Sequence, residues 1–363
     1  MIRIERRAPL PGTAGAMLVV GGVLVALAVG ALFLWATGHD AVQAYLDMLR
    51  GAAGSPYALQ QTIVKAIPLA LTGLAVALAF RAGLWNIGAE GQLVMGAFLS
   101  SWAALTLLWP AWALLPAMVL LGLAGGALWA LLPAVPRALF GTNEIITTLL
   151  LNYVALLWVD YLVFGPWADP SAFSFPYSRA FPDAARLPLL FGTPVHAGVL
   201  LVPVIAAGLT FALRHTAWGY EIRVMGHSPP TAAYAGIPVA ASILGVMALS
   251  GGIAGVAGMG EVSGVIGRIQ QGISPGYGYS AIIIAWLARL HPWGTVAVAV
   301  GFAALINGGY ALQTSGVPAA IASMLQALLL FSVLVSDFFL THRVVARRSA
   351  LAAVAGRDVH AEL

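Results

Sequence analysis

The polar side chains that interrupt apolar stretches are the residues of this chain with the clearest chemical meaning. Glu90 stands between Asn86 and Gln92 in the glycine-rich segment Ala82–Gln92. Charged and amide groups are costly in an apolar medium, so they pair with one another or line a polar path. Freed backbone groups are tolerated there only beside protein or a water-filled cavity. We therefore predict a solute path beside Trp85, Asn86, Glu90 and Gln92, although Glu90 could equally serve to accept hydrogen bonds from freed amides.

A second glycine-rich region lies in the other half of the chain. It covers Ser250–Gly260 and then Ser274–Tyr279. Helices broken at comparable places in two halves are typical of transporters, and we predict that both stretches interrupt helices. Close helix packing is the alternative, and for each single glycine it is the better explanation.

Four further residues are candidates for the same path. Asn152 and Tyr153 lie in the middle of an apolar stretch, where they could line the path or tie two helices together. Tyr277 and Tyr279 close the second glycine-rich region. Aromatic rings such as these would suit stacking on a nucleobase, but Tyr and Trp also gather at membrane interfaces.

Several kinds of catalytic or metal chemistry are excluded by what the chain lacks. It has no cysteine, which removes disulfides, thiolate metal sites and cysteine nucleophiles. A phosphate-binding loop needs a lysine after its glycines, and Lys65, the chain's one lysine, stands inside an apolar run. No zinc-protease or serine-hydrolase motif occurs. We therefore predict a chain that is not an enzyme, holds no metal or cofactor of its own, and depends on another polypeptide for any energy from ATP.

The polar segment before Pro238 has the marks of a short helix with two defined ends. Ser228 can cap the N-terminus and Pro229 suits the first helical position. Gly236 suits a left-handed C-terminal cap, and Pro238 prevents continuation. A helix of about two turns is unstable alone, so it needs a partner surface. It is either a docking helix that transmits force from a cytoplasmic motor or an ordinary turn in a loop.

The composition shows that lipid surrounds these residues. Of 363 residues, 61% are hydrophobic and 8% are charged, whereas soluble domains carry about 25% charged residues. A membrane-spanning helix needs about 20 apolar residues. Besides Glu90, the carboxylates in or beside these apolar stretches are Glu144, Asp160, Glu261 and Asp337, and they are expected near the interfaces, where they cost little. The sequence predicts an all-α membrane protein of about ten transmembrane helices, at residues 14–36, 61–80, 84–108, 111–133, 143–164, 195–213, 240–260, 279–290, 294–312 and 318–340.

Basic residues set the expected orientation. With the N-terminus inside, twelve arginines fall in inner loops and tails, and Arg50, Arg179, Arg186 and Arg268 fall outside. This asymmetry follows the positive-inside rule and places both termini in the cytoplasm. We expect one membrane domain at 14–340 with cytoplasmic tails at 1–13 and 341–363, an external loop at 165–194 and a cytoplasmic loop at 214–238.

Three separated motifs resemble one family. They are Leu84–Gly96, Gly141–Tyr153 and the loop ending Ala232–Ile237, and together they are similar to permeases of bacterial ABC importers for branched-chain amino acids, simple sugars and nucleosides. The segment Ser274–Tyr279 favours the nucleoside or simple-sugar branch, which basic-membrane-protein-type lipoproteins serve. The resemblance covers roughly residues 60 to 340.

The resemblance implies a type II importer fold with broken helices in the bacterial inner membrane. It also implies three partners: an ABC ATPase with two fused nucleotide-binding halves that binds ATP and Mg, a second and different permease, and an external substrate-binding lipoprotein. One departure is that this chain reads His227-Ser-Pro-Pro-Thr-Ala-Ala233 where the family often has Asn-Pro-x-Ala-Ala, so the register of the following tyrosine can shift. The implied ATPase-coupling residues are Ser228, Pro229, Thr231, Ala232, Ala233, Tyr234, Gly236 and Ile237.

Three function classes remain after this reading. The first is an importer permease that moves a nucleoside by alternating access, with a simple sugar or other small polar solute as the alternative. The second is an ion-coupled secondary transporter, which would need a site such as paired carboxylates at mid-membrane. The third is a membrane-embedded enzyme, which would need convergent His, Ser or Asp groups, whereas the histidines here are scattered.

Overall fold

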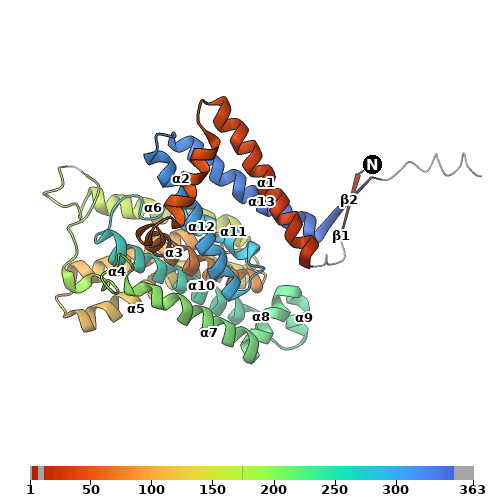
Figure 1. The fold of residues 1–363 in the computed structure, drawn as a ribbon. Helices are drawn as coiled ribbons and strands as arrows, with labels where there is room; N and C mark the ends of the chain where they lie inside the picture. Colours follow the sequence, from red (N-terminus) through yellow and green to blue (C-terminus); the bar gives the residue numbers. More distant parts are fainter. Residues whose placement is uncertain (1, 7–11, 174, 347–363) are drawn as a thin grey trace, which may run out of the picture. The chain divides into compact units, whose positions relative to one another are not determined.

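The computed structural model describes residues 2–6, 12–173 and 175–346. It divides into a terminal unit, Met1–Leu46 with Leu312–Leu363, and a central unit, Asp47–Ala311. Both units are built from helices (Figure 1). The elements are β1 (Ile2–Arg6), α1 (Gly12–Ala36), α2 (Ala41–Ala53), α3 (Pro56–Arg81), α4 (Ala89–Thr106), α5 (Ala111–Phe140), α6 (Glu144–Phe164), η1 (Asp183–Ala185), η2 (Ala197–Leu200), α7 (Leu201–His215), α8 (Ala217–His227), α9 (Pro229–Tyr234), α10 (Val239–Glu261), the π-helical η3 (Val262–Ile266), α11 (Tyr277–Leu287), α12 (Pro292–Thr314), α13 (Ala319–Thr341) and β2 (His342–Ala346).

Glycines lie at the closest contacts where α4, α5 and α10 cross in the central unit. A methyl group on Gly255 of α10 would overlap the carbonyl of Gly122 on α5, and one on Gly96 of α4 would overlap Gly255 itself. Gly126 and Gly251 meet in the same way one turn away. Small residues let helix backbones approach closely, which is the usual means of packing helices in a membrane.

This packing corrects one prediction about the second glycine-rich region. Ser250–Gly260 does not interrupt a helix, because α10 runs unbroken from Val239 to Glu261. The break comes only after Glu261, at the π-helical turn that ends at Gly267 with φ +73°. The glycines of α10 face neighbouring backbones, so here the packing explanation holds and the broken-helix prediction is wrong.

The predicted count of about ten transmembrane helices is also too high by length and composition. In the described part of the chain, seven helices are long and apolar enough to cross a membrane, or up to eight if Val20–Ala36 and Ala41–Ala53 form one bent span. Helix α11 is short, with 11 residues. Helix α4 has 18 residues but carries Glu90 and Gln92 at its start, which lower its apolar character.

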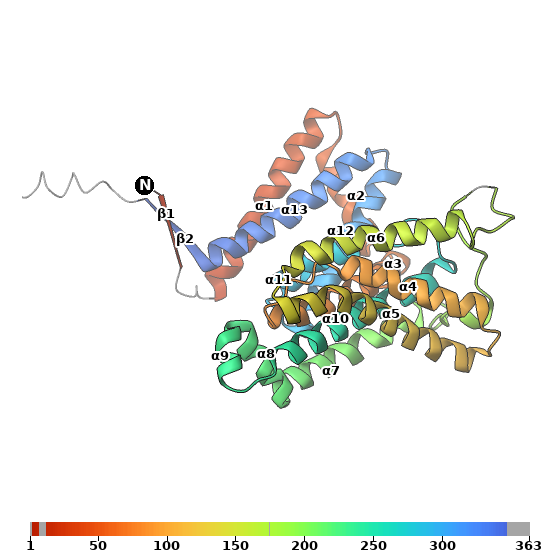
Figure 2. The ribbon, with the colours of Figure 1, turned by 180° about the vertical axis from the view of Figure 1, so that it is seen from behind.

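Residues 165–194 and the segment that contains α8 and α9 lie at opposite ends of the central unit. Figures 1 and 2 show α7 running from the side of residues 165–194 to the side of α8 and α9. The loop folds back on the chain after α10: the Ser178 amide donates to the Ile269 carbonyl at 2.8 Å, and the Phe181 amide donates to the Gly267 carbonyl at 2.8 Å.

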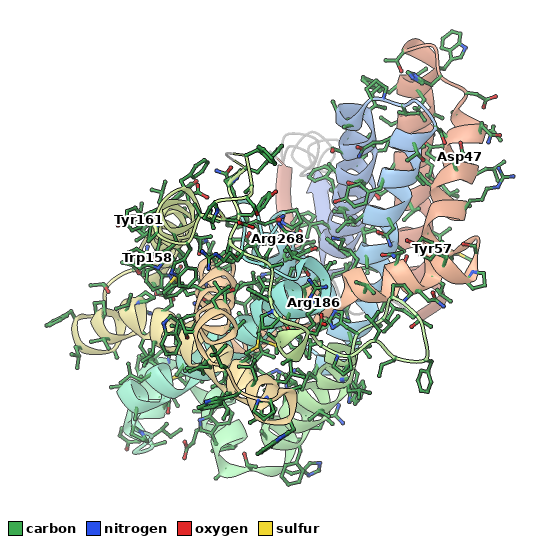
Figure 3. All side chains as sticks on the ribbon, turned by 90° about the vertical axis from the view of Figure 1, so that its left-hand side faces the viewer. Asp47, Tyr57, Trp158, Tyr161, Arg186 and Arg268 are labelled. Carbon is green, nitrogen blue, oxygen red and sulfur yellow. The ribbon has the colours of Figure 1, made fainter. Side chains whose placement is uncertain are left out.

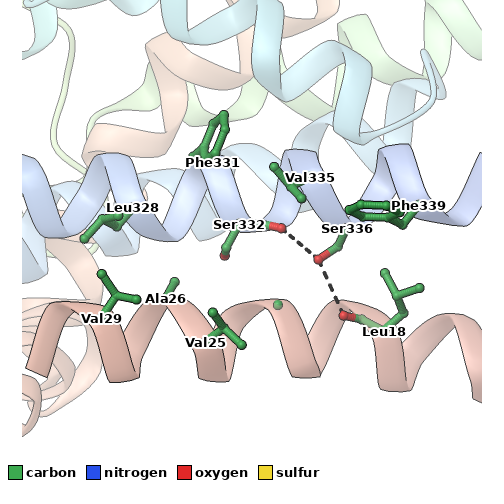
Figure 4. Close-up of a pocket in the computed structure, with 11 residues that line it drawn as sticks. Leu18, Val25, Ala26, Val29, Leu328, Phe331, Ser332, Val335, Ser336 and Phe339 are labelled. Atoms are coloured by element: carbon green, nitrogen blue, oxygen red, sulfur yellow. Dashed lines mark hydrogen bonds between the residues drawn. The ribbon is translucent and has the colours of Figure 1, made fainter. Parts of the chain in front are cut away.

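The terminal unit joins the two ends of the chain. Strands β1 and β2 pair antiparallel, with Ile2 opposite Ala346. Helices α1 and α13 leave a cavity of about 400 Å³ between them, lined almost wholly by apolar side chains (Figure 4). Ser336 on α13 donates to the Ser332 carbonyl at 2.7 Å and reaches Leu18 O on α1 at 3.5 Å. The side chain of Asp337, residues 7–11 and residues 347–363 lie outside what the structure describes.

Candidate functional site

The two broken segments of the central unit meet at Glu90. Residues 82–88 separate α3 from α4, and α11 begins at Tyr277 after an irregular stretch. The Gly278 amide donates to Glu90 Oε2 at 2.7 Å, and Ser274 and the Gly276 amide also interact with this carboxylate. A side chain on Gly278 would overlap the backbone of Glu90. Glu90 is therefore buried where it receives freed backbone amides, which is one of the two roles its position allowed.

Asn86 and Gln92 hold the first break together. Their amides form a reciprocal pair, with Asn86 Nδ2 donating to Gln92 Oε1 at 2.9 Å and Gln92 Nε2 donating to Asn86 Oδ1 at 2.8 Å. Asn86 also donates to Ser250 Oγ at 2.9 Å, and Ser250 donates to the Ala75 carbonyl on α3 at 2.7 Å. Both amides are fully buried. They connect α3, α4 and α10 and present no surface to a path in this conformation.

Asn152 joins the two breaks on the other side. Its Oδ1 accepts from the Gly91 amide at 2.9 Å, and its Nδ2 donates to the Ile87 carbonyl at 3.0 Å and to the Tyr279 hydroxyl at 3.2 Å. Asn152 is buried, whereas Tyr279 and its neighbour Tyr153 are exposed. The two tyrosines are therefore the predicted path residues whose polar groups remain accessible beside the junction.

A charged group that the sequence analysis did not place in the path lies near the same junction. Lys65 Nζ donates to the Tyr277 hydroxyl at 2.7 Å and lies 5.4 Å from the centre of its ring. The Tyr277 hydroxyl lies 3.5 Å from Glu261 Oε1. Tyr277 and Glu261 are buried and Lys65 is half-buried. Three helices, α3, α10 and α11, are thus joined through one lysine and one carboxylate.

Glu261 was expected near an interface, and the structure shows how the protein accommodates this carboxylate. Its carboxylate is buried and depends on the tyrosine and on the charge of Lys65. The sequence does hold one sign of this group, because a lysine inside an apolar span, such as Lys65, needs a partner. The sequence could not show which carboxylate that partner was.

Trp85 lies away from the polar junction, in an aromatic cluster. Its ring centre is 4.9 Å from that of Phe80 and 6.0 Å from that of Trp286. The Trp85 amide donates to Glu144 Oε1 at 3.2 Å, and Glu144 Oε2 lies 3.2 Å from Arg137 Nε. Glu144 is thus a buried ion-pair partner that fixes the start of the first break.

The exposed face of α6 carries further aromatic residues beyond Tyr153. Trp158 and Tyr161 project from the periphery of the helix (Figure 3), with 5.9 Å between their ring centres. A broad apolar and aromatic face of this kind is suited to lipid or to another membrane helix. This face of α6 therefore differs from the polar junction around Glu90 and Asn152.

The coupling segment has the local geometry that its sequence predicts. Ser228 caps α9 by accepting from the Thr231 amide at 3.3 Å, and Pro229 stands at the first helical position. At the other end Gly236 has φ +79°, its amide donates to the Ala233 carbonyl at 3.0 Å, and Ile237 donates to Ala232 at 3.0 Å. These two bonds make a Schellman cap. Ala232 packs inside, while Tyr234 is 96% exposed.

One buried histidine was not foreseen. His196 packs against Gly198 and Gly264, and neither of its ring nitrogens has a hydrogen-bond partner. Burial lowers the pKa of His196 from 6.5 to about 4, because an apolar site disfavours the charged ring. This histidine is therefore neutral near pH 7. Across the described residues, no group of three or more His, Asp or Glu side chains is placed to hold a metal ion.

Comparison with known proteins gives a consistent family. The model of the branched-chain amino acid transport system permease component matches residues 58–334. The chain is 38% identical to the glucose ABC transporter permease protein TsgB13 of Haloferax volcanii, over 94% of this chain and 93% of that protein. It is 30% identical to the guanosine ABC transporter permease protein NupP of Bacillus subtilis, over 86% and 90%.

A third relative extends the same pattern. The nucleoside ABC transporter permease protein NupB of Lactococcus lactis subsp. cremoris is 27% identical, over 84% of this chain and 87% of that protein. No solved structure matches the chain. The family model covers well over half of the sequence, and the relatives align along nearly their whole lengths. This chain therefore belongs to the branched-chain amino acid transport system permease family and is a membrane-embedded permease component of an ABC transporter.

Proposed function

We propose that the chain is the permease subunit of an importer that moves a neutral solute with a sugar ring, a simple sugar or a nucleoside, by alternating access. The observation that carries the proposal is the junction of the two broken segments, where Asn152 holds the Tyr279 hydroxyl beside the exposed Tyr153. Hydroxyl and amide groups suit a solute rich in hydroxyls, and a tyrosine ring suits the face of a sugar or a base. Transport makes and breaks no covalent bond in the solute.

The choice between the two solutes rests on different arguments. The resemblance of Ser274–Tyr279 favoured a nucleoside from the sequence, with Trp85, Tyr153, Tyr277 and Tyr279 suited to stacking on a base, and relatives at 30% and 27% identity are named for guanosine and nucleosides. However, Tyr277 is buried, so one of the four rings is not accessible to a solute, and Trp85 packs in an aromatic cluster although it stays exposed. The relative at 38% identity is named for glucose. We place the simple sugar first and the nucleoside second.

The proposed partners follow from the subunit plan of such importers. An ATPase with two fused nucleotide-binding halves binds ATP and Mg, a second and different permease completes the path, and an external lipoprotein delivers the solute. We propose that α9 docks on the ATPase, because its capped ends make it a rigid body and Tyr234 is almost fully exposed. Residues 165–194, at the opposite end of the central unit, would receive the lipoprotein. Both termini would then be cytoplasmic.

The deciding experiment is solute-stimulated ATP hydrolysis by this chain reconstituted in nanodiscs with the ATPase, second permease and binding protein encoded beside it. Hydrolysis is expected to rise with glucose-loaded binding protein and to rise less, or not at all, with guanosine. The reverse order would put the nucleoside first. Uptake driven by an ion gradient through this chain alone, with no copurifying ATPase, would reject the importer and favour a secondary transporter.

Two pairs of variants connect the experiment to the structure. Tyr279→Phe removes the hydroxyl held by Asn152 and is expected to raise the solute concentration for half-maximal uptake by about tenfold, the size of one lost hydrogen bond. Its control is Tyr161→Phe on α6, which keeps the contact between this ring and Trp158. Tyr234→Glu is expected to abolish solute-stimulated hydrolysis, while Tyr220→Glu, on the exposed face of α8, is expected to leave it intact.

A further inference from the structure

One polar group beside the junction of the broken segments lacks a partner. Trp129 lies on α5, and its indole N–H is buried without a hydrogen bond to any described residue. A buried donor that is left unpaired is costly, so each one calls for an explanation. The Trp129 Nε1 atom lies 3.1 Å from the point where a Cβ on Gly91 of α4 would stand. The unpaired donor is therefore inside the molecule, next to the first turn of α4.

An acceptor lies beside the same point. Asn152 Oδ1, from α6, is 2.9 Å from the position of the missing Gly91 Cβ, and it accepts from the Gly91 amide at 2.9 Å. An amide oxygen has two lone pairs, and this hydrogen bond uses one of them. Because Gly91 has no side chain, a donor from α5 and an acceptor from α6 share the space beside α4. Trp129 and Asn152 are close, but they are not bonded to each other.

The hydrogen bond from Gly91 to Asn152 takes the place of a helix cap. The first amides of a helix have no partner within the helix, and the side chain of the N-cap residue usually accepts from one of them. The N-cap residue of α4 is Gly88, which makes no such bond because it has no side chain. Asn152 caps α4 from another helix instead. Movement of α6 away from α4 would therefore break this cap.

Helix α6 is attached to the central unit along one narrow stripe. Its buried residues recur every three or four positions between Thr148 and Val159. The start of the helix is held to α5 by the ion pair of Glu144 with Arg137, at 3.2 Å. Segments with few buried contacts move at low cost, and sliding of one packed helix over another is a common form of conformational change. A shift of α6 relative to α4, with its start still held at α5, is therefore the motion that the packing allows.

We propose that Asn152 is a two-position switch in the transport cycle. In the conformation of the structure, its Oδ1 caps α4 through the Gly91 amide. In the second conformation α6 has shifted, and the same oxygen accepts from Trp129 Nε1. Trp129 is then a positioning residue, because it supplies the hydrogen bond that the shifted Asn152 would otherwise lose. The shift also separates Asn152 Nδ2 from the Tyr279 hydroxyl that it now contacts, which frees that hydroxyl for the solute.

The indole N–H has opposite effects on the two conformations. It is an unpaired buried donor in the first and a bonded donor in the second, so its removal favours the first conformation on both counts. The inference rests on the proposed alternating access, which requires a second conformation, but it does not depend on which solute is moved.

The test measures the distance between α5 and α6. The chain has no cysteine, so Leu120→Cys on α5 and Leu157→Cys on α6, both at exposed positions, take one spin label each before assembly. The labelled chain is combined with its ATPase and second permease in nanodiscs. Double electron–electron resonance then gives the distances without nucleotide and after trapping with ATP and vanadate. Two distances are expected, and nucleotide should change their ratio.

Loss of the N–H should shift this ratio. Where both distances are populated, Trp129→Phe is expected to lower the second relative to the first by about tenfold, the effect of one hydrogen bond. Replacement of Trp129 by benzothienylalanine, which has sulfur in place of the indole N–H, keeps the size of the ring and should give the same shift. Trp112→Phe, at an exposed position of the same helix, should leave the ratio unchanged. In an Asn152→Leu background, which lacks the acceptor, Trp129→Phe should have no further effect.

Three results would overturn the proposal. A single distance that nucleotide does not change would mean that α6 does not shift. An unchanged ratio with benzothienylalanine, together with a lower unfolding temperature, would mean that the N–H already has a partner such as an ordered water. An equal effect of Trp129→Phe with and without Asn152 would mean that Asn152 is not the acceptor. Solute-stimulated ATP hydrolysis is measured on the same nanodiscs: its absence in the unsubstituted protein rejects the importer, whereas stimulation with one fixed distance rejects the switch.

Discussion

The buried polar residues of the central unit differ in what their hydrogen bonds do. The side-chain amides of Asn86 and Gln92 hydrogen-bond to each other, and Asn86 also donates to Ser250. The Glu90 carboxylate accepts from an amide at the start of α11. These residues make a broken backbone tolerable in a membrane, where an unsatisfied group costs several kcal/mol. Tyr279 differs because only one side of its hydroxyl is engaged by Asn152, and its ring is accessible.

Tyr277 and Tyr279 therefore allow a matched test of which hydroxyl stabilises the fold and which remains available to a solute. Tyr277→Phe leaves Lys65 and Glu261 without the hydroxyl between them, and it is expected to destabilise the protein by about 2 kcal/mol because the lost bonds involve charged groups. Tyr279→Phe is expected to cost about 1 kcal/mol or less, because water can replace a bond at an exposed hydroxyl. Equilibrium unfolding in mixed micelles measures both changes.

A double-mutant cycle tests whether Lys65 and Glu261 interact. If Lys65 and Glu261 form a coupled group, Lys65→Met with Glu261→Gln should be less destabilising than the sum of the single changes, because each single change leaves an uncompensated charge. Additive costs would mean that the two charges do not interact, and that their contacts with Tyr277 do not couple them.

The sequence singled out most of the residues that meet at this junction, but not the hydrogen bonds they make. Glu90, Asn152 and Tyr279 were predicted because polar groups in apolar stretches need a reason. Their separation from Lys65 and Glu261 along the chain hid the group that Tyr277 completes. Spacing can show that a buried charge needs a partner, yet only the fold brings residues 65, 261 and 277 together.

At the scale of helices, end signals were predictable and helix interiors were not. Ser228, Pro229 and Gly236 mark α9 as predicted, because caps depend on neighbouring residues in the chain. The glycines of Ser250–Gly260 were misread as a break because a missing Cβ permits both a break and a close approach. Which one occurs depends on α4 and α5, which the local sequence does not contain.

Two glycines of α10 test this explanation within one helix. Gly255 packs against the backbones of Gly122 and Gly126, whereas Gly245 has no neighbour where a methyl group would stand. Gly255→Ala is expected to destabilise the fold by about 1–3 kcal/mol through overpacking. Gly245→Ala is expected to be neutral or to stabilise it by up to about 1 kcal/mol, since alanine favours a helix.

Unfolding in mixed micelles again gives the comparison, with far-UV circular dichroism to show that α10 remains helical. An equal effect of the two substitutions would indicate that α10 does not pack on α5 through its glycines. A tolerated Gly255→Ala would likewise require the helix crossing to be looser than the structure has it.

For the whole molecule, the pairing of β1 with β2 constrains the path of the chain through the membrane. Two ends held in one sheet lie on the same side, so the number of complete crossings is even. Within the described ranges, seven helices qualify by length and composition, an odd number. At least one further segment, such as the bent pair Val20–Ala36 with Ala41–Ala53 or the polar α4, must therefore complete a crossing, which explains why hydropathy alone miscounts.

The absence of cysteine allows a direct test of this topology, because a single introduced cysteine is the only thiol. Phe173, in the loop of residues 165–194, is 93% exposed and Tyr234 on α9 is 96% exposed, so the membrane alone should decide their labelling. In intact cells, with the outer barrier made permeable, a membrane-impermeant maleimide is expected to label Phe173→Cys. It should label Tyr234→Cys only in inverted vesicles or after full permeabilisation. Labelling of both from the same side would contradict their placement at opposite ends of the central unit. Labelling of Tyr234→Cys alone from outside would reverse the orientation that the arginines favour, and would remove α9 from any cytoplasmic ATPase.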